Sequence, residues 1–201
     1  MKQEDILPGS QGEHSLQKKY KTQDKAKDFY QRQMLSSLSV SMQDFIKEQE
    51  MVFISTADAK GECDSSFRSG EKGFVLVLDE NNLAYAEYKG NGVMASMGNI
   101  SENPHIGMLF LDVLKDKVGL HVNGKARVLS GEDLHSCLSN SSYEKIEVYD
   151  KGLPNKEVAW VLIEVEEAYI HCSKNIPLFQ KNDKKEEWNK ARPIDYFNLG
   201  N

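Results

Sequence analysis

The chain has 201 residues, a net charge of −6 at neutral pH and an isoelectric point near 5.4. An acidic chain of this length fits one domain with or without an appended arm, and it does not favour nucleic acid as the main partner, because a phosphate backbone attracts a basic face. No apolar run approaches the roughly 20 residues of a membrane span, and the N-terminus has no apolar signal region. The three cysteines form no Cys-x-x-Cys pair: Cys63, Cys137 and Cys172. We therefore expect a cytoplasmic protein with reduced thiols.

The first 50 residues are expected to form an arm and helices that pack on the main domain. Residues 1–14 are rich in turn-forming residues and poor in apolar ones, which is typical of a loose arm. From residue 22 to 38 apolar side chains recur at helical spacing, and Asp24 lies near the start, where a carboxylate suits the helix dipole. Ser41 is expected to cap a second, short helix that ends near Glu50.

The composition changes at Met51, from where apolar and β-branched runs alternate with turn-forming residues. Asp58-Ala59-Lys60-Gly61 is typical of a hairpin turn, and Asn103-Pro104 ends a short helix, because proline disfavours helix at the residue before it. Ser130 is expected to cap another short helix. The expected strands span residues 51–57, 62–68, 74–78, 83–88, 105–112, 118–129 and 158–172. Six or seven strands joined by short turns, with helices at the edges, predict a mainly β (α+β) antiparallel barrel.

The junction between the fourth strand and the helix after it is the most informative segment. Tyr88 ends the strand, and Lys89-Gly90-Asn91-Gly92 follows at once. Backbone N–H groups at a helix start, beside a lysine, are suited to holding a phosphate. The spacing is neither that of a Walker loop nor that of a Rossmann loop, and a plain strand–turn–helix junction is the alternative.

The ordered set of segments resembles the pyridoxamine 5'-phosphate oxidase family, whose fold is a split barrel that binds flavin mononucleotide (FMN). The hairpin, the phosphate turn, the Asn-Pro stop and a glycine-containing strand occur in the family's order. The likeness to an oxidase-related subgroup also includes Gly12-Glu13-His14 and Tyr169-Ile170-His171-Cys172-Ser173-Lys174. The segments that carry the likeness are residues 56–68, 88–91, 99–110 and 121–128. The resemblance implies a split-barrel domain over residues 51–175, preceded by residues 1–50 and followed by a tail, 176–201.

The resemblance also implies a homodimer with FMN at the interface of two barrels. The implied cofactor-binding residues lie on the strand after the first hairpin and in the turn after the fourth strand: Arg68, Ser69, Lys89, Gly90 and Asn91. Arginine offers a planar fork to phosphate oxygens and lysine a point charge. For Arg68 the alternative is a surface ion pair with Glu71 or Asp64.

A second candidate region is His171-Cys172-Ser173-Lys174. Lys174 is counted among the cofactor-binding residues, where it would meet the flavin or its substrate. The alternative is a strand end at which Cys172 packs inward. The five histidines show no metal signature, so no metal site is predicted.

The family's Arg-x-His segment, which grips the substrate near the C-terminus, has no counterpart here, since Arg192 is followed by Pro193 and Ile194. The resemblance therefore does not extend to the substrate. The predicted function is an FMN-dependent oxidoreductase acting on an unidentified small molecule, with no catalytic acid or base assigned. The alternatives are a non-catalytic flavin-binding or sequestering protein, a haem-binding or haem-degrading split barrel, and a site that holds a deazaflavin.

Overall fold

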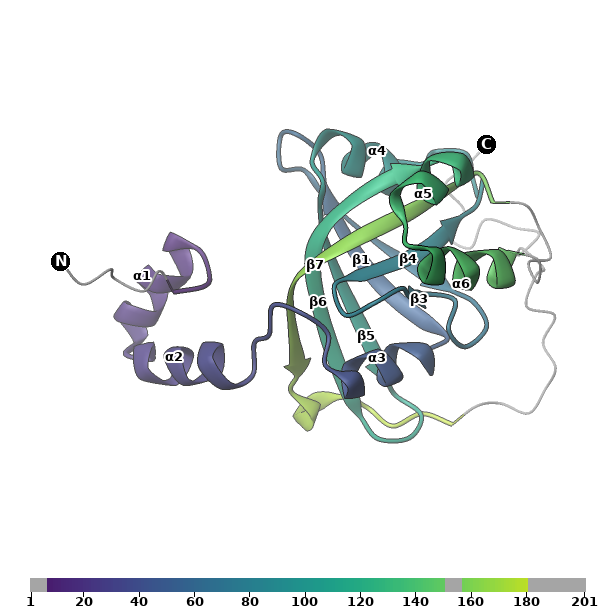
Figure 1. Ribbon diagram of the computed structural model, residues 1–201. Helices are drawn as coiled ribbons and strands as arrows, with labels where there is room; N and C mark the ends of the chain where they lie inside the picture. Colours follow the sequence, from purple (N-terminus) through teal and green to yellow (C-terminus); the bar gives the residue numbers. More distant parts are fainter. Residues whose placement is uncertain (1–6, 151–156, 181–201) are drawn as a thin grey trace, which may run out of the picture.

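The computed structural model describes residues 7–150 and 157–180 (Figure 1). The strands within these ranges are β1 Met51–Ala57, β2 Cys63–Ser69, β3 Leu76–Val77, β4 Asn82–Glu87, β5 His105–Asp112, β6 Val118–Leu129 and β7 Ala159–His171. The helices are α1 Gln11–Tyr20, α2 Gln23–Arg32, α3 Val40–Lys47, α4 Ala95–Glu102, α5 Gly131–Cys137 and α6 Asn140–Asp150, with a short 3₁₀ helix, η1, at Ser173–Asn175.

The seven strands form one antiparallel sheet in the order β2-β1-β5-β6-β7-β4-β3. The sheet curls on itself, because Arg68 of β2 bonds to Glu87 of β4 although four strands separate them in the sheet order. No backbone ladder joins β2 to β4, so the barrel is split along this line. The predicted split barrel with edge helices is therefore confirmed. We call the gap between β2 and β4 the seam.

Alternating side chains fill the barrel, as expected for strands with one face on a core. Val52 and Ile54 of β1 and Met108 and Phe110 of β5 are all buried. A second core lies on the other side of β4 and β7, where Trp160 packs with residues of α5 and α6. Figure 1 shows these two helices side by side against that part of the barrel.

Most strands match the sequence prediction closely. The bounds of β1, β5 and β6 are those expected, and β2, β4 and β7 differ by one residue at each end. The third strand is shorter than predicted: only Leu76 and Val77 pair, with β4, at the edge of the sheet. Phe74 and Val75 are buried, so their apolar character reflects core packing and not strand pairing.

The N-terminal region departs most from the expectation. The prediction of a loose arm is wrong from Gln11, because α1 begins there. Ser10 and Glu13 form a reciprocal capping box, a sequence signal that the prediction overlooked. Helix α2 ends at Arg32, well before the predicted end at Leu38. Neither α1 nor α2 has a buried residue, and Figure 1 shows both standing beside the barrel.

The cap of α3 is Ser39 and not Ser41, which corrects the prediction. The Ser39 hydroxyl accepts a hydrogen bond from the Met42 N–H at 3.3 Å, whereas Ser41 lies inside the first turn. Ser39→Ala should therefore lower the free energy of unfolding by about 1 kcal/mol, and Ser41→Ala by clearly less. Urea denaturation of the two variants measures the difference, and equal losses would contradict the assignment.

Two histidines and a tyrosine form a cluster on the outer face of β6 and β7. His121 Nε2 and His171 Nδ1 lie 2.8 Å apart and share a hydrogen bond, and the His121 ring stacks on Tyr169 with centroids 4.7 Å apart. Burial, and then the charge of His171, lower the pKa of His121 below its usual 6.5. As the pH falls, the unfolded chain therefore protonates at His121 before the folded chain does. The contribution of neutral His121 to the free energy of unfolding is fully present above about pH 6.5 and is lost as the pH falls through the lower pKa of the folded state.

His121→Phe should accordingly reduce the loss of stability between pH 7 and pH 5, because phenylalanine can stack on Tyr169 and does not titrate. His105→Gln is the matched control, since His105 is exposed at the start of β5. The urea midpoints of wild type and both variants at the two pH values measure the effect. A wild-type pH dependence retained in His121→Phe would contradict it.

None of the helices in the described ranges is both long and apolar enough to cross a membrane. The described residues also hold no group of three or more histidine, cysteine or acidic side chains placed to bind a metal ion. Arg192, where the sequence departs from the family's Arg-x-His segment, lies outside the residues that the structure describes.

Candidate functional site

A pocket of about 430 Å³ lies at the seam, between β2 and the loop that joins β4 to α4. Four of the six predicted cofactor-binding residues line it: Arg68, Lys89, Gly90 and Asn91. The volume is in the range of small-molecule sites, which is roughly 300–1,000 Å³. Residues about 20 positions apart in the sequence are thus brought together by the closure of the barrel.

Arg68 is held by β2 with its side chain toward the barrel interior. Along this strand Asp64, Ser66 and Arg68 are half-buried and alternate with exposed residues, so all three share the face that lines the pocket. The Arg68 guanidinium bonds to Glu87 Oε1 through Nε at 2.9 Å and Nη2 at 2.6 Å. The alternative expected for Arg68 was a surface ion pair with Glu71 or Asp64, and the structure gives Glu87 as its partner instead.

Lys89 lies in the tight turn after β4, and it is exposed. Gly92 N–H donates to the Lys89 carbonyl at 2.9 Å, and Asn91 Oδ1 accepts from Val93 N–H at 3.0 Å. The glycine at position 92 has a φ of +81°, a conformation that other residues rarely adopt. Within the described part of the chain Lys89 forms no ion pair, which leaves its ammonium group available to a ligand.

The N-terminus of α4 faces the same pocket. Met94, at the N-cap position, has left-handed backbone (φ +57°) and supplies no side-chain cap. The N–H groups of the first helical turn, at Ala95, Ser96 and Met97, lack acceptors within the helix. All three residues line the pocket, so a positive helix end adds to the charge of Lys89.

An apolar rim borders the charged part of the pocket. Tyr88, Val93 and Met94 line it and are 40%, 72% and 42% exposed. Exposed apolar side chains beside cations favour a ligand that has an anionic end and an apolar, planar part. A phosphate ester of an aromatic ring system has this character.

The other two predicted cofactor-binding residues, Ser69 and Lys174, do not line this pocket. Ser69 follows Arg68 on β2 and is exposed on the opposite face, so it does not line the pocket. Lys174 is in η1, just after the C-terminal end of the 13-residue strand β7. The pocket residue Glu87 pairs with Ala159 at the start of the same strand, so Lys174 and the pocket lie at opposite ends of β7. Cys172 is exposed, so the alternative in which it packs inward is wrong.

Glu87 and Ser96 are pocket residues that the sequence analysis missed. Ser96 is buried and its hydroxyl donates to Asp64 Oδ2 at 3.4 Å, which links α4 to β2. Period-two alternation along β4 places Glu87 on the same face as Tyr85, and this signal could have indicated its inward direction.

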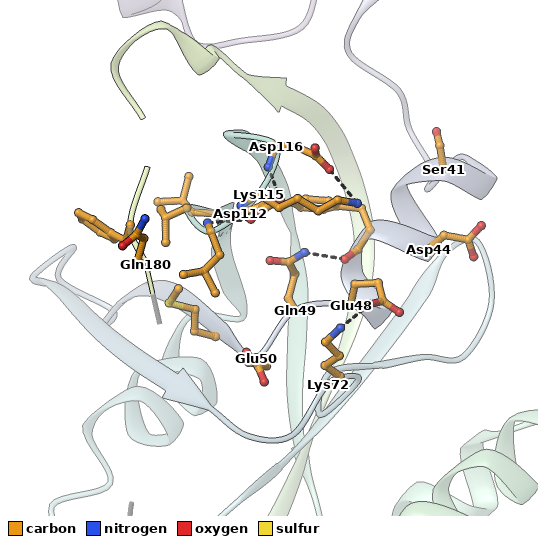
Figure 2. Close-up of a pocket in the computed structure, with 16 residues that line it drawn as sticks. Ser41, Asp44, Glu48, Gln49, Glu50, Lys72, Asp112, Lys115, Asp116 and Gln180 are labelled. Carbon is orange, nitrogen blue, oxygen red and sulfur yellow. Dashed lines mark hydrogen bonds and ion pairs between the residues drawn. The ribbon is translucent and has the colours of Figure 1, made fainter. Parts of the chain in front are cut away.

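A larger pocket of about 870 Å³ lies near α3 and the turn between β5 and β6. Figure 2 shows Lys72 reaching Glu48 on its wall, at 2.7 Å, and the carboxylate of Asp112 accepts from three backbone N–H groups. None of the six predicted site residues lines this pocket. Its acidic side chains do not suit an anionic cofactor.

An antiparallel split barrel with a pocket at its seam, lined by two cations and two carboxylates, is the class of protein that this fold and site define. The sequence pattern of the family described as pyridoxamine 5'-phosphate oxidase matches residues 38–172. The chain belongs to the pyridoxamine 5'-phosphate oxidase family. Among curated proteins none matches the chain.

Several solved structures are similar to the chain. HupZ of Group A Streptococcus is 21% identical with a TM-score of 0.51, and the match covers 66% of this chain and 93% of HupZ. A putative pyridoxamine 5'-phosphate oxidase of Lactobacillus delbrueckii is 23% identical (TM-score 0.48; 68% and 98% covered). HutZ of Vibrio cholerae, a heme storage protein, is 12% identical (TM-score 0.42; 66% and 94% covered). At these identities the likeness concerns the fold alone.

Proposed function

We propose that the chain is an FMN-binding flavoprotein that acts as an oxidoreductase on a small molecule. The observation that carries the proposal is the convergence of Arg68, Lys89 and the free N–H groups of α4 on one pocket with an apolar rim. This donor set fits a phosphate, and the rim fits a ring system.

In this proposal the protein residues bind and orient the cofactor. Lys89 supplies a charge-assisted contact to the phosphate, and Gly90 and Asn91 let the backbone approach it. Tyr88 and Met94 lie where they would cover part of the ring. Bound flavin would supply hydride or electron transfer, and no residue is assigned as catalytic acid or base.

We also propose that two copies of the chain associate through the outer face of the barrel. Phe53 and Phe67 are 41% and 50% exposed on neighbouring strands of this face, with ring centroids 5.4 Å apart. Aromatic side chains exposed together favour an interface. Lys174 and Ser69, which do not line the pocket of their own chain, would then contribute through the second copy.

The absorption spectrum of the purified protein tests the proposal. Bound FMN should give the yellow flavin bands, and added FMN should raise the melting temperature of the apoprotein, because a ligand stabilises the state that binds it. A colourless protein with no thermal protection by FMN would overturn the proposal. A shifted spectrum would identify a deazaflavin instead.

Two further measurements separate the alternatives. If FMN binds and neither a nicotinamide cofactor nor oxygen changes its redox state, the non-catalytic, sequestering function gains support. A Soret-type band on titration with haem would support the haem-binding alternative. The proposed cytoplasmic location has the support of the three cysteines, which are exposed and unpaired.

A further inference from the structure

The carboxylate of Glu87 lies in the same pocket as the two proposed phosphate-binding cations. Its side chain is only 8% exposed, and that of its partner Arg68 is 22% exposed. A buried carboxylate beside a phosphate site is unexpected, because like charges repel strongly where water is excluded. The position of the Glu87 carboxylate therefore calls for a physical explanation.

One role is to fix the Arg68 guanidinium. Glu87 Oε1 takes the Nε–H and one hydrogen of Nη2, while Nη1 donates to Ser66 Oγ at 2.7 Å and to the Phe67 carbonyl at 3.0 Å. An arginine has five N–H donors, so these contacts leave one free, on Nη2. Arg68 can thus offer a phosphate only a single hydrogen bond unless it releases Glu87.

The second role concerns charge. The charged side chains that line the pocket are Arg68, Lys89, Asp64 and Glu87, so their formal charges cancel. Within the described residues of a single chain, excess positive charge at the pocket then comes only from the N-terminus of α4, which amounts to about half an elementary charge. A phosphate monoester carries between one and two negative charges near neutral pH, with its second pKa at about 6.

We propose that Glu87 makes the pocket select the singly charged form of the phosphate ester. This inference rests on the proposed function. With the half charge of α4 counted, a dianion would leave about one and a half uncompensated negative charges beside a buried carboxylate, whereas a monoanion would leave about half a charge. On binding, the dianionic ester therefore takes one proton from solvent, and that proton stays on the phosphate.

Three other titratable groups near Glu87 bear on the charge of the pocket. Asp64 and Lys89 line the pocket and are included in the charge count. Tyr85 lies two residues before Glu87 on β4, with its hydroxyl buried and unbonded within the described residues. Burial, and then the charge of Glu87, raise the pKa of Tyr85 far above neutral, so it stays uncharged between pH 6 and pH 8.

The test is the affinity for FMN and for riboflavin at pH 6 and pH 8, in wild type and Glu87→Gln. If only the monoanion binds, the wild-type Kd for FMN should rise about 50-fold between the two pH values, as the fraction of monoanion falls. Riboflavin, without a phosphate, should show no such rise. Glu87→Gln keeps an acceptor for Arg68 and removes the charge, so its Kd for FMN should rise less than about fivefold.

Glu48→Gln is the matched control, because Glu48 forms an exposed ion pair with Lys72 away from this pocket, and it should keep the wild-type pH profile. A flat wild-type profile, or a 50-fold rise retained in Glu87→Gln, would overturn the inference and leave the proposed function standing. Failure of wild type to bind FMN at either pH would overturn both.

Proton uptake measured on wild type keeps the inference testable if Glu87→Gln does not fold. Calorimetric titration with FMN at pH 7.5, in buffers of different ionisation enthalpy, should show uptake of close to one proton per FMN bound. Uptake near zero would overturn the inference.

Discussion

Replacing Lys89 with alanine should weaken the binding of FMN by about 1.5–3 kcal/mol, a loss of roughly 10- to 150-fold, because a charge-assisted contact to the phosphate disappears. Riboflavin binding should change little, since riboflavin has no phosphate for Lys89 to contact. Fluorescence titration of wild type and Lys89→Ala with both flavins measures the two effects. Lys89 is exposed and forms no ion pair in the described residues, so its removal should not disturb the fold.

Lys72→Ala is the matched control for this substitution. Lys72 is also an exposed lysine, but it pairs with Glu48 on the wall of the larger pocket (Figure 2). Its loss should leave the affinity for FMN near the wild-type value. Equal weakening of FMN and riboflavin in Lys89→Ala would show that Lys89 does not contact the phosphate.

Gly124→Ala should cause the largest loss of stability among the substitutions considered, at about 3 kcal/mol or more. Gly124 sits at the irregularity where the register between β6 and β7 shifts. A Cβ atom at this position would overlap the carbonyl oxygen of Glu164 and lie 3.2 Å from Val165 Cα. Both neighbours are backbone atoms of a central strand, so neither can move aside without breaking the ladder.

Gly98→Ala is the control for this prediction. Gly98 lies within α4, and a Cβ there would meet nothing within 4 Å. Alanine should therefore stabilise the helix by up to about 1 kcal/mol. Thermal melts should show a fall of roughly 10 °C for Gly124→Ala and a rise of a few degrees for Gly98→Ala. A Gly124→Ala protein as stable as wild type would contradict the close packing of β6 against β7.

Strands whose pattern is set by their own residues were predictable from the sequence. The apolar runs of β1 and β5 and the alternation in β6 lie within single segments, and their bounds match the prediction. Helices α1 and α6 were not predicted, because the helix signals in their sequences are weak. Helix α1 has only Leu16 and Tyr20 as apolar side chains, too few for an apolar stripe, and α6 begins with Asn140-Ser141-Ser142, which are weak helix formers.

The site was predictable in part. The turn residues Lys89, Gly90 and Asn91 are neighbours in the sequence, and Arg68 joined them through the family resemblance. The pairing of Arg68 with Glu87 depends on how the barrel closes, which no local pattern encodes. Whether Ser69 or Arg68 faces the pocket depends on a single step along β2, because successive strand residues point to opposite faces.

A crystal structure of the protein grown with FMN would locate the bound phosphate. We expect the phosphate within about 3 Å of Lys89 Nζ, at the N-terminus of α4, with the flavin ring against Tyr88 and Met94. A flavin whose phosphate lies away from the seam, or crystals without bound flavin at saturating FMN, would contradict it.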